Sequence, residues 1–186
     1  LKIKKKYKIN KDTKILEIGS NDGYLLNNFK SITKNIVGLD ASKKMTLVSA
    51  KKDIFSINGI LNNNSKKLIT KKFKKFDLII ANNVVNHMDN LISSLRIVKS
   101  LLKNNGSFIF EQPYWLDTIQ TKRYDQIYHE HITYFTVSFA KNLARILDMN
   151  FYDFEIINYH GKSIRLYFSK NSKNKLFEVK KKKISK

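Results

Sequence analysis

A short apolar strand that ends in a glycine turn constrains the fold of this chain more than any other feature. It lies in residues 14–26, KILEIGSNDGYLL, where an apolar ILEI run is followed by Gly19, a polar bend, Gly23 and an apolar helix start. A Rossmann-like sheet forms its first nucleotide-contacting loop from a strand, a glycine turn and a helix. Glycine is needed there because a Cβ would collide with the ligand or force an unfavourable φ.

The carboxylates of this loop indicate the class of nucleotide. A dinucleotide site reads G-x-G-x-x-G and places a pyrophosphate on bare helix N–H groups, whereas this loop carries Glu17 and Asp22 beside its glycines. Two like charges ~4 Å apart at an effective dielectric constant of about 20 repel by roughly 4 kcal/mol, so these acids favour an ammonium or sulfonium group over a pyrophosphate. S-adenosylmethionine carries both cations and no phosphate, and we predict it as the cofactor. The loop residues expected to bind it are Glu17, Gly19, Ser20, Asn21, Asp22 and Gly23.

Two further strand ends extend the predicted cofactor site. The NIVGLD run reads as the next strand and ends at Asp40, about 20 residues beyond the glycine turn, where such sheets bind ribose hydroxyls. An alternative for Asp40 is the N-cap of the helix that follows Ser42. The apolar FDLIIA run is typical of a buried parallel strand and leads into Asn82 and Asn83, which complete the predicted set.

The composition favours a single domain with a proper core. The 186 residues are 42% hydrophobic, and cysteine is absent, which excludes disulfides and thiolate metal sites. No apolar run approaches the ~18 residues of a membrane span, and no apolar segment follows the basic N-terminus as it does in a signal peptide. We therefore expect a cytoplasmic protein without a membrane partner.

The net charge of +21 has two explanations. Of the 36 basic residues, four are arginine and 32 (36 − 4) are lysine. Dedicated nucleic-acid readers favour arginine for bidentate contacts to phosphate and guanine, whereas lysine, asparagine and isoleucine share A/T-rich codons. A low-GC genome accounts for this balance without a polyanionic partner, so nucleic-acid binding is the less favoured explanation.

Strands and helices alternate over residues 14–111 and predict a right-handed, doubly wound sheet. Leu91, Leu95 and Val98 fall at three- and four-residue steps, so we expect an amphipathic helix there, ended by the Asn104-Asn105-Gly106 stretch. The other expected elements are helices over 22–31 and 43–51, a Lys-rich and weakly helical stretch over 65–75, a weakly patterned strand over 54–61 and a strand over 107–111.

The pattern changes after Pro113. Residues 114–135 are polar and aromatic without a clear period, and an amphipathic helix around Phe139 follows them. The stretches 151–159 and 163–168 alternate as a closing antiparallel pair. The expected fold is therefore α/β, a Rossmann-like, doubly wound, mostly parallel sheet with an antiparallel closing hairpin.

Five motifs follow one another along the chain. They are LEIGSNDGYLL, ANNVVNH at 81–87, FEQPY at 110–114, YDQIYHEHITYF at 124–135 and HGKSIRLY at 160–167. Together they resemble the central domain of the sugar C-methyltransferase family, class I S-adenosylmethionine enzymes that act on nucleotide-linked deoxy-keto-sugars. The resemblance implies the class I methyltransferase fold for a domain over 14–169, with a basic lead-in over 1–13 and a basic, disordered tail over 170–186.

The resemblance also implies a mechanism. In the family a base removes a proton from the sugar carbon beside a ketone, and the enolate attacks the activated methyl group. A base that titrates near neutrality suits this step, as an unperturbed histidine does with a pKa of ~6.5. By resemblance the base is His131, and Glu130 and Tyr128 orient it or polarise the substrate. Residues implied to reach the substrate are His160, Ser163 and Arg165, unless His160 is only a turn residue.

Other interpretations of these side chains stay open. His129 and His131 could share one side of an extended segment and bind a metal, although the sequence offers no third matched ligand. His87 could cap a helix that begins near Met88, or it could line the cofactor pocket. The aromatic side chains expected in the core are Tyr134, Phe135 and Phe139.

The chain departs from the family pattern. Family members resemble three-part proteins, with a zinc-binding region before the cofactor domain and a second Rossmann-like domain after an HGGS-type turn, and we expect neither here. Lys162 stands where the family usually has a second glycine, which disfavours φ > 0 at that point. A separate chain could supply the missing domains. Two other functions stay open: methylation of RNA or another polyanion, and a truncated, non-catalytic cofactor-binding module.

Overall fold

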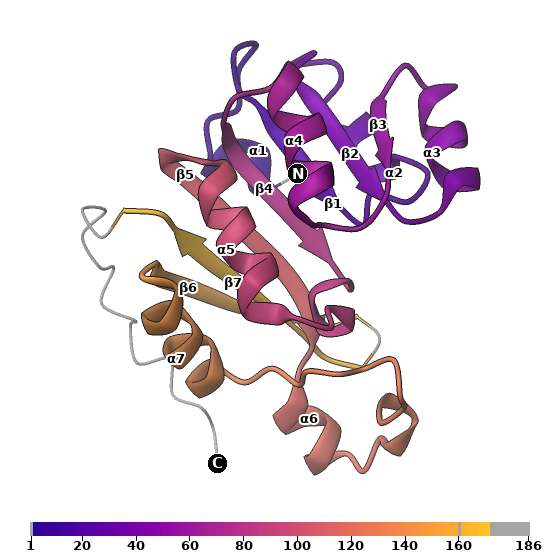
Figure 1. Ribbon diagram of the computed structural model, residues 1–186. Helices are drawn as coiled ribbons and strands as arrows, with labels where there is room; N and C mark the ends of the chain where they lie inside the picture. Colours follow the sequence, from indigo (N-terminus) through magenta and orange to yellow (C-terminus); the bar gives the residue numbers. More distant parts are fainter. Residues whose placement is uncertain (1, 160, 172–186) are drawn as a thin grey trace.

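Seven strands form one sheet in this computed structural model, which describes residues 2–159 and 161–171. The strands are β1 Ile15–Ile18, β2 Ile36–Asp40, β3 Phe55–Asn58, β4 Phe76–Asn82, β5 Leu102–Pro113, β6 Asn150–Ile157 and β7 Ser163–Ser169. Their order is β3-β2-β1-β4-β5-β7-β6 (Figure 1). Strands β1 to β5 run parallel, and β7 is antiparallel to both β5 and β6. The predicted α/β fold with an antiparallel closing pair is confirmed.

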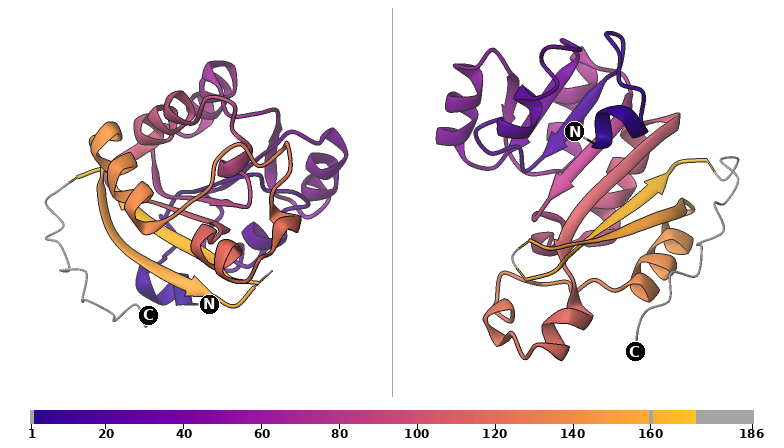
Figure 2. Two further views of the ribbon diagram at one scale, coloured as in Figure 1. Left: turned by 90° about the horizontal axis from the view of Figure 1, so that it is seen from below. Right: turned by 180° about the vertical axis from the view of Figure 1, so that it is seen from behind.

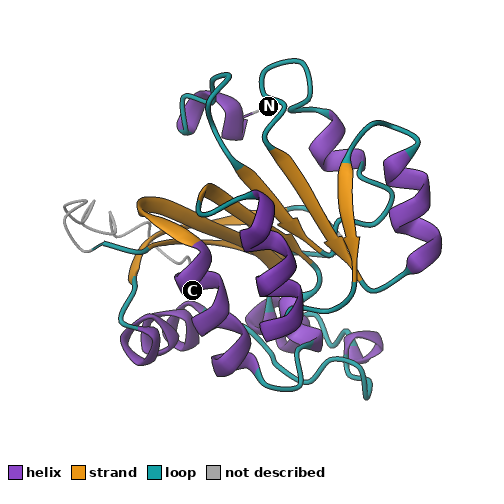
Figure 3. Cartoon of the chain, turned by 45° about the horizontal axis from the view of Figure 1, so that its top comes forward, coloured by secondary structure: helices purple, strands orange, loops and turns teal. Residues whose placement is uncertain are grey.

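Helices cover both faces of the sheet (Figure 3). One face packs against α4, α5 and α7 through Ile69, Leu95 and Leu143, and the other packs against α1 and α2 through Ile3 and Leu26. The helices are α1 Lys2–Lys6, α2 Tyr24–Asn27, α3 Lys43–Ala50, α4 Asn63–Lys72, η1 Val85–His87, α5 Leu91–Leu101, α6 Trp115–Gln120, η2 Tyr124–Gln126 and α7 Val137–Leu147, where η marks a single 3₁₀ turn.

Alternation along the strands separates two apolar layers. Leu16 and Ile18 of β1 face the layer with α4, α5 and α7, whereas Ile15 faces the layer with α1 and α2, because successive side chains of a strand point to opposite faces. The central parallel strands are buried on both faces, which is why β4 reads as a continuous apolar run. Burial of each large apolar side chain contributes roughly 1.5–3 kcal/mol to the free energy of folding. These layers therefore stabilise the sheet, one edge of which carries the site.

The predicted bounds of two helices were wrong. The helix after the glycine loop has only four residues, because Gly23 (φ 77°) is its N-cap and the chain then turns through i→i+3 hydrogen bonds as far as Ile32. Helix α5 ends at Leu101, and the stretch 104–106 lies inside β5, whose first residue pairs with Phe76 of β4. A long-range strand pairing therefore overrides the local helix-ending signal there.

Both weakly patterned elements form. The Lys-rich stretch is the regular helix α4, which begins with a capping box. The side-chain oxygen of Asn62 accepts a hydrogen bond from the Ser65 N–H, and the Ser65 hydroxyl accepts one from the Asn62 N–H. This reciprocal pair satisfies two of the backbone donors that a helix start leaves unbonded. The third strand forms as β3 at the edge of the sheet.

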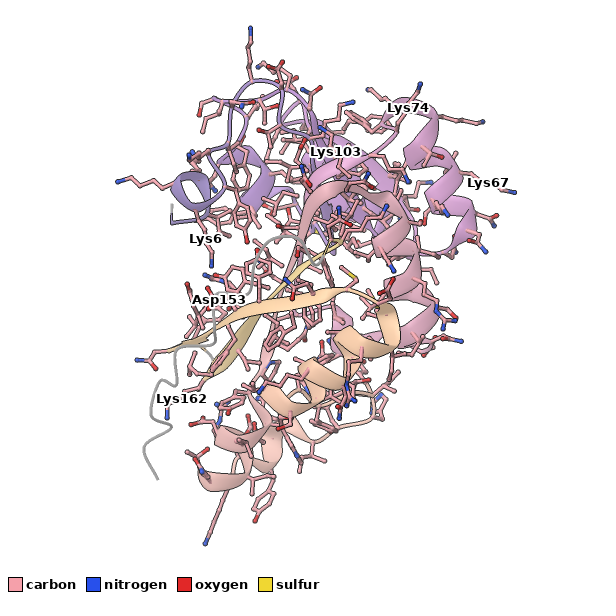
Figure 4. The ribbon with its side chains drawn as sticks, turned by 90° about the vertical axis from the view of Figure 1, so that its left-hand side faces the viewer. Lys6, Lys67, Lys74, Lys103, Asp153 and Lys162 are labelled. Atoms are coloured by element: carbon pink, nitrogen blue, oxygen red, sulfur yellow. The ribbon has the colours of Figure 1, made fainter. Side chains whose placement is uncertain are left out.

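The basic lead-in packs against the sheet, as Figure 2 shows from behind. The hydroxyl groups of Tyr7 and Tyr152 lie 2.5 Å apart, and Lys6 forms an ion pair of 2.7 Å with Asp153 of β6 (Figure 4). Most of the predicted tail, residues 172–186, lies outside the described residues. None of the helices described is long and apolar enough to cross a membrane.

Candidate active site

The carboxyl ends of the parallel strands meet at one edge of the sheet and carry the candidate site. Gly19 follows β1, Asp40 ends β2 and η1 follows β4. Residues 114–135, which follow β5, lie beyond the same edge with α6 at their start (Figure 1). Ligands of open parallel sheets bind at this edge, so the structure gathers the predicted motifs where such a site is expected.

A cavity of about 560 Å³ opens at this edge. Its wall includes Gly19, Asp40, Ile60, Val84 and His87. The volume falls within the roughly 300–1,000 Å³ of small-molecule sites. Because His87 belongs to η1, the cavity runs from the glycine loop to the segment after β4.

The two glycines of the loop have different tasks. Gly19 has φ 71°, and a Cβ on it would lie 3.1 Å from the Cβ of Val84 at the cavity wall. Gly23 has φ 77°, and its Cβ would lie 2.5 Å from the Ser49 hydroxyl and 2.8 Å from Ile54. A side chain at Gly19 would therefore press on Val84 in the cavity wall, whereas Gly23 allows the start of α2 to pack on the protein interior.

Glu17 is a buried acid beneath the loop. The residue is only 4% exposed, and its Oε2 has no hydrogen-bond partner among the described residues. The pKa of Glu17 is raised to about 8, chiefly by burial; a backbone hydrogen bond from Leu26 opposes the rise, and the charges of Asp40 and Asp22 add to it. The hydroxyl of Ser20 is also buried without a partner. A cation bound near this loop would stabilise the charged form of Glu17.

Asp40 organises the loop at the cavity wall. Its carboxylate accepts the Asn21 N–H at 2.7 Å and the Ser42 N–H at 2.8 Å. The N-cap of α3 is Ser42, whose hydroxyl accepts the Met45 N–H, so the interpretation of Asp40 as the N-cap was wrong. Each carboxylate oxygen has a further lone pair, which leaves Asp40 able to accept hydroxyl donors from the cavity side.

His131 and Tyr128 form a hydrogen-bonded pair. Nδ1 of His131 lies 2.8 Å from the Gln126 carbonyl, and Nε2 lies 2.8 Å from the Tyr128 hydroxyl. A carbonyl oxygen only accepts, so Nδ1 carries the hydrogen, and the Tyr128 hydroxyl donates to the lone pair on Nε2. The neutral imidazole is thus oriented with its basic nitrogen toward Tyr128.

His87 connects this pair to the cavity. It lines the cavity, its Nδ1 donates to the Glu130 carbonyl at 2.8 Å, and its ring centroid lies 5.0 Å from that of His131. Helix α5 begins only at Leu91 with Asn90 as its N-cap. His87 therefore does not cap that helix, and it lines the cavity in which we predict the cofactor.

A comparison with family models identifies the protein family of this chain. The family model described as a methyltransferase domain matches residues 3–154. The chain belongs to this methyltransferase family. The membership confirms the sequence-based prediction of S-adenosylmethionine as the cofactor.

Two curated relatives are similar over part of their length. The C-methyltransferase NovU of Streptomyces niveus is 24% identical over 153 residues, which cover 82% of this chain and 36% of NovU. The ubiquinone biosynthesis O-methyltransferase of Pelagibacter ubique (strain HTCC1062) is 33% identical over 108 residues, which cover 56% of this chain and 44% of that protein. The methyltransferase described here therefore spans less than half the length of either relative.

Solved structures share the fold. A SAM-dependent methyltransferase of Thermotoga maritima matches with a TM-score of 0.66 at 17% identity, over 86% of this chain and 83% of that chain. The magnesium protoporphyrin IX methyltransferase of Synechocystis PCC 6803, solved with bound SAH, matches with a TM-score of 0.65 at 13% identity, over 86% and 74% of the two chains. Both likenesses support the class I methyltransferase fold.

The residues at the cavity fit S-adenosylmethionine. In the cavity wall, Gly19 lacks a Cβ that would press on Val84, and Asp40 presents carboxylate lone pairs. Glu17 lies outside the wall and is a buried acid with one oxygen that has no partner among the described residues. When bound, the cofactor supplies a methyl group activated by its sulfonium. In this methyltransferase, Asp40 would hold hydroxyl groups of the cofactor and Glu17 would balance its positive charge.

Of the nine predicted cofactor residues, Gly19 and Asp40 line the cavity and the other seven do not. Asn21 (φ 49°) donates to Asp40 through its backbone, and Asn83 (φ 51°) donates to the Glu111 carbonyl. Asn82 ends β4 with an exposed side chain. Asp22 forms an ion pair of 2.7 Å with Lys52, and that hydrogen bond is the main cause that holds the pKa of Asp22 below its ordinary value. Their binding roles stay predictions.

Among the described residues, the hydrogen-bond partners of the His131 ring are Tyr128 and Gln126, and the carboxylate of Glu130 is not one of them. Its side chain is 64% exposed, and its recorded charged neighbour is His129 at 4.0 Å, itself 91% exposed. Glu130 therefore does not orient His131 here, and the Gln126 carbonyl does so instead. Among the described residues, no three His, Asp or Glu side chains converge as a metal site requires.

The predicted substrate residues of the closing hairpin have structural partners. The Ser163 hydroxyl is buried and donates to the Tyr159 carbonyl at 3.2 Å. Arg165 forms ion pairs with Glu111 at 2.9 Å and with Glu155 at 3.4 Å across three neighbouring strands. The structure does not bring them to His131, and His160 lies outside the described residues.

The hairpin turn is held by Asp117 and Arg123, which the sequence did not single out. Lys162 forms an ion pair of 2.8 Å with the buried Asp117 of α6. Gly161 has φ 86°, and the guanidinium of Arg123 occupies the space where its Cβ would lie. Lys162 itself has no positive φ, so the lysine at this position costs no backbone strain.

Proposed function

We propose that this methyltransferase domain transfers a methyl group to a carbon beside the ketone of a nucleotide-linked deoxysugar, with His131 as the base. The observation that carries the proposal is the Tyr128–His131 pair, which keeps the lone pair of His131 on Nε2. The ring centroid of His87, in the cavity wall, lies 5.0 Å from that of His131, which supports a base close to the cofactor. The resemblance of the YHEH motif and the similarity to a C-methyltransferase support the same acceptor chemistry.

The residues of the pair perform complementary steps. Nε2 of His131 removes the proton from the carbon beside the ketone, and the electron pair of the broken C–H bond moves into the enolate. The Tyr128 hydroxyl, released from Nε2 by the substrate, donates to the oxygen where negative charge develops. The Gln126 carbonyl stabilises the imidazolium because it accepts from Nδ1. The enolate carbon would then bond to the methyl group that S-adenosylmethionine supplies, as the methyl–sulfur bond breaks and S-adenosylhomocysteine leaves.

A second candidate is transfer to oxygen. The Pelagibacter relative is named an O-methyltransferase and is 33% identical over 108 residues. On a hydroxyl acceptor, His131 would remove the proton from oxygen, and no enolate would form. The two acceptors give products that NMR separates, since a methyl on carbon and a methyl on oxygen resonate far apart.

We also propose that further polypeptide covers the acceptor side, either in the same protein or in a separate chain. The matched relative NovU is longer, with 36% of its length covered here. The chain segment after β5 exposes six large apolar side chains: Leu116, Ile119, Tyr124, Ile127, Tyr128 and Ile132. Such a concentration of exposed apolar residues beside a site marks an interaction surface.

The test is proton exchange followed by methyl transfer. The chain is incubated in D₂O with S-adenosylhomocysteine and a panel of nucleoside diphosphate-linked keto-deoxysugars. We expect it to catalyse exchange of the proton beside the ketone for deuterium. His131→Ala abolishes this exchange but still binds S-adenosylhomocysteine. His129→Ala is the matched control, because His129 is exposed two residues away, and it keeps the wild-type exchange rate. Equal exchange rates in the two variants would remove His131 from the mechanism.

A further inference from the structure

Two buried amide side chains at the active edge have polar atoms that find no hydrogen-bond partner within residues 2–159 and 161–171. Gln112 of β5 is 0% exposed, and neither its Nε2 nor its Oε1 is bonded. Asn86 of η1 is 2% exposed, and its Oδ1 is not bonded. A buried polar group that makes no hydrogen bond costs folding free energy, so two such groups near one site call for a partner.

The two amides belong to elements that touch. Phe110 of β5 packs in the layer beneath α5 and α7, and by strand alternation Gln112 points to the same side. The carboxyl end of β5 contacts η1, which contains Asn86. The chain just before η1 is tied to β5, because the Asn83 N–H donates to the Glu111 carbonyl at 2.8 Å.

The turn η1 also connects the cofactor cavity to the base. His87, next to Asn86, lines the cavity. The Asn86 carbonyl accepts the N–H groups of Ile132 at 2.9 Å and Thr133 at 3.2 Å, the two residues directly after His131. A movement of η1 is therefore passed through main-chain hydrogen bonds to the backbone that carries His131.

We propose that Gln112 is a positioning residue of this methyltransferase, whose Nε2 donates a hydrogen bond to Oδ1 of Asn86 when the cofactor fills the cavity. The unpartnered atoms are complementary, one a donor and the other an acceptor. A cofactor that contacts His87 presses on η1 and brings the two amides together. The new bond fixes η1 on β5 and sets the position of His131. The cofactor-bound state thus prepares the base before the acceptor arrives.

A double-mutant cycle tests the proposal in the full chain with S-adenosylhomocysteine as the probe. Gln112→Met and Asn86→Ala are each expected to weaken its binding by roughly threefold to tenfold, the worth of one hydrogen bond. The double variant is expected to be no weaker than the weaker single variant, because both substitutions remove the same bond. Without ligand, Gln112→Met is expected to keep or raise Tm, since an unbonded amide is replaced by an apolar side chain of similar shape.

Ser107→Ala is the control, because Ser107 is buried on the same strand but bonds Tyr152 on the opposite face. Independent effects that multiply in the double variant would overturn the proposal. So would a lower Tm or failure to fold of ligand-free Gln112→Met, which would mean that the amide is already bonded. In the wild-type chain, NMR is expected to show slower exchange of the Gln112 side-chain amide protons once S-adenosylhomocysteine binds. An unchanged exchange rate contradicts the proposal without any variant.

Discussion

The imidazole rings of His87 and His131 lie with their centroids 5.0 Å apart, and each ring donates its Nδ1 hydrogen to a backbone carbonyl. The acceptors are the carbonyls of Glu130 and Gln126. Both rings therefore expose Nε2 as the basic nitrogen, one in the cofactor cavity wall and the other beside Tyr128. In the proposed mechanism, the cofactor side and the acceptor side of the site would meet at this contact.

Removal of the Tyr128 hydroxyl tests its role at the acceptor. Tyr128→Phe keeps the ring that lies against His131, with centroids 4.1 Å apart, but loses the donor. Methyl transfer is therefore expected to fall by roughly 10²-fold, with unchanged affinity for S-adenosylhomocysteine. Tyr124→Phe is the control, because Tyr124 is 70% exposed, and it should retain full transfer. Stopped-time assays with labelled cofactor measure the rates, and calorimetry measures the affinity. Equal rates for the two variants would assign Tyr128 a packing role only.

The buried acid Glu17 makes the stability of the ligand-free protein depend on pH. Burial raises its pKa from 4.5 to about 8, so the folded state keeps a proton that the unfolded chain releases. The free energy of unfolding therefore falls as the pH rises from about 4.5 to about 8 and stays low above that range. Glu17→Gln is expected to show a flatter Tm profile over this interval and a higher Tm at its upper end, measured by calorimetry.

The same residue links cofactor affinity to pH. S-adenosylmethionine carries positive charge that stabilises the charged carboxylate, so the affinity of the wild-type chain is expected to rise with pH up to about 8, and Glu17→Gln abolishes this rise. Asp22→Asn is the matched comparison within the loop, because Asp22 already pairs with Lys52. A pH-dependent affinity that survives in Glu17→Gln would show that Glu17 does not sense the cofactor.

The motifs predicted that the site lies at this edge of the sheet, because the end of a strand can be recognised from a few neighbouring residues. The run into Gly19 and the acid at Asp40 could both be read from neighbouring residues, and the structure places both at the cavity. The partner of His131 could not be predicted, because a backbone carbonyl such as that of Gln126 leaves no mark in the sequence. Arg165 was expected at the substrate, but its two acid partners follow from the pairing of three strands far apart in the chain.

Asp40 is expected to contribute strongly to cofactor affinity. Its carboxylate holds the loop through Asn21 and lines the cavity, so Asp40→Ala loses both the loop contact and the acceptor for cofactor hydroxyls. We expect binding of S-adenosylmethionine to weaken by roughly tenfold to 100-fold, as for one or two hydrogen bonds to a charged group. Asp53→Ala, which removes an exposed acid paired with Lys30, is expected to leave the affinity unchanged in the same titration.

The contact between Gly19 and Val84 gives a prediction with a built-in rescue. Gly19→Ala forces a side chain into φ 71° and places its Cβ 3.1 Å from the Val84 Cβ. The two effects together are expected to destabilise the protein by roughly 1–3 kcal/mol and to narrow the cavity, which weakens cofactor binding. Val84→Ala in the same chain removes the two methyl groups that lie 3.2 and 3.3 Å from the added Cβ. It is expected to restore part of the affinity but not the stability lost to backbone strain, because φ is unchanged. Urea unfolding measures the stability of the two single variants and the double variant, and calorimetric titration measures their affinity for the cofactor. If the losses of affinity in the single variants add in the double variant, Gly19 does not act through this contact.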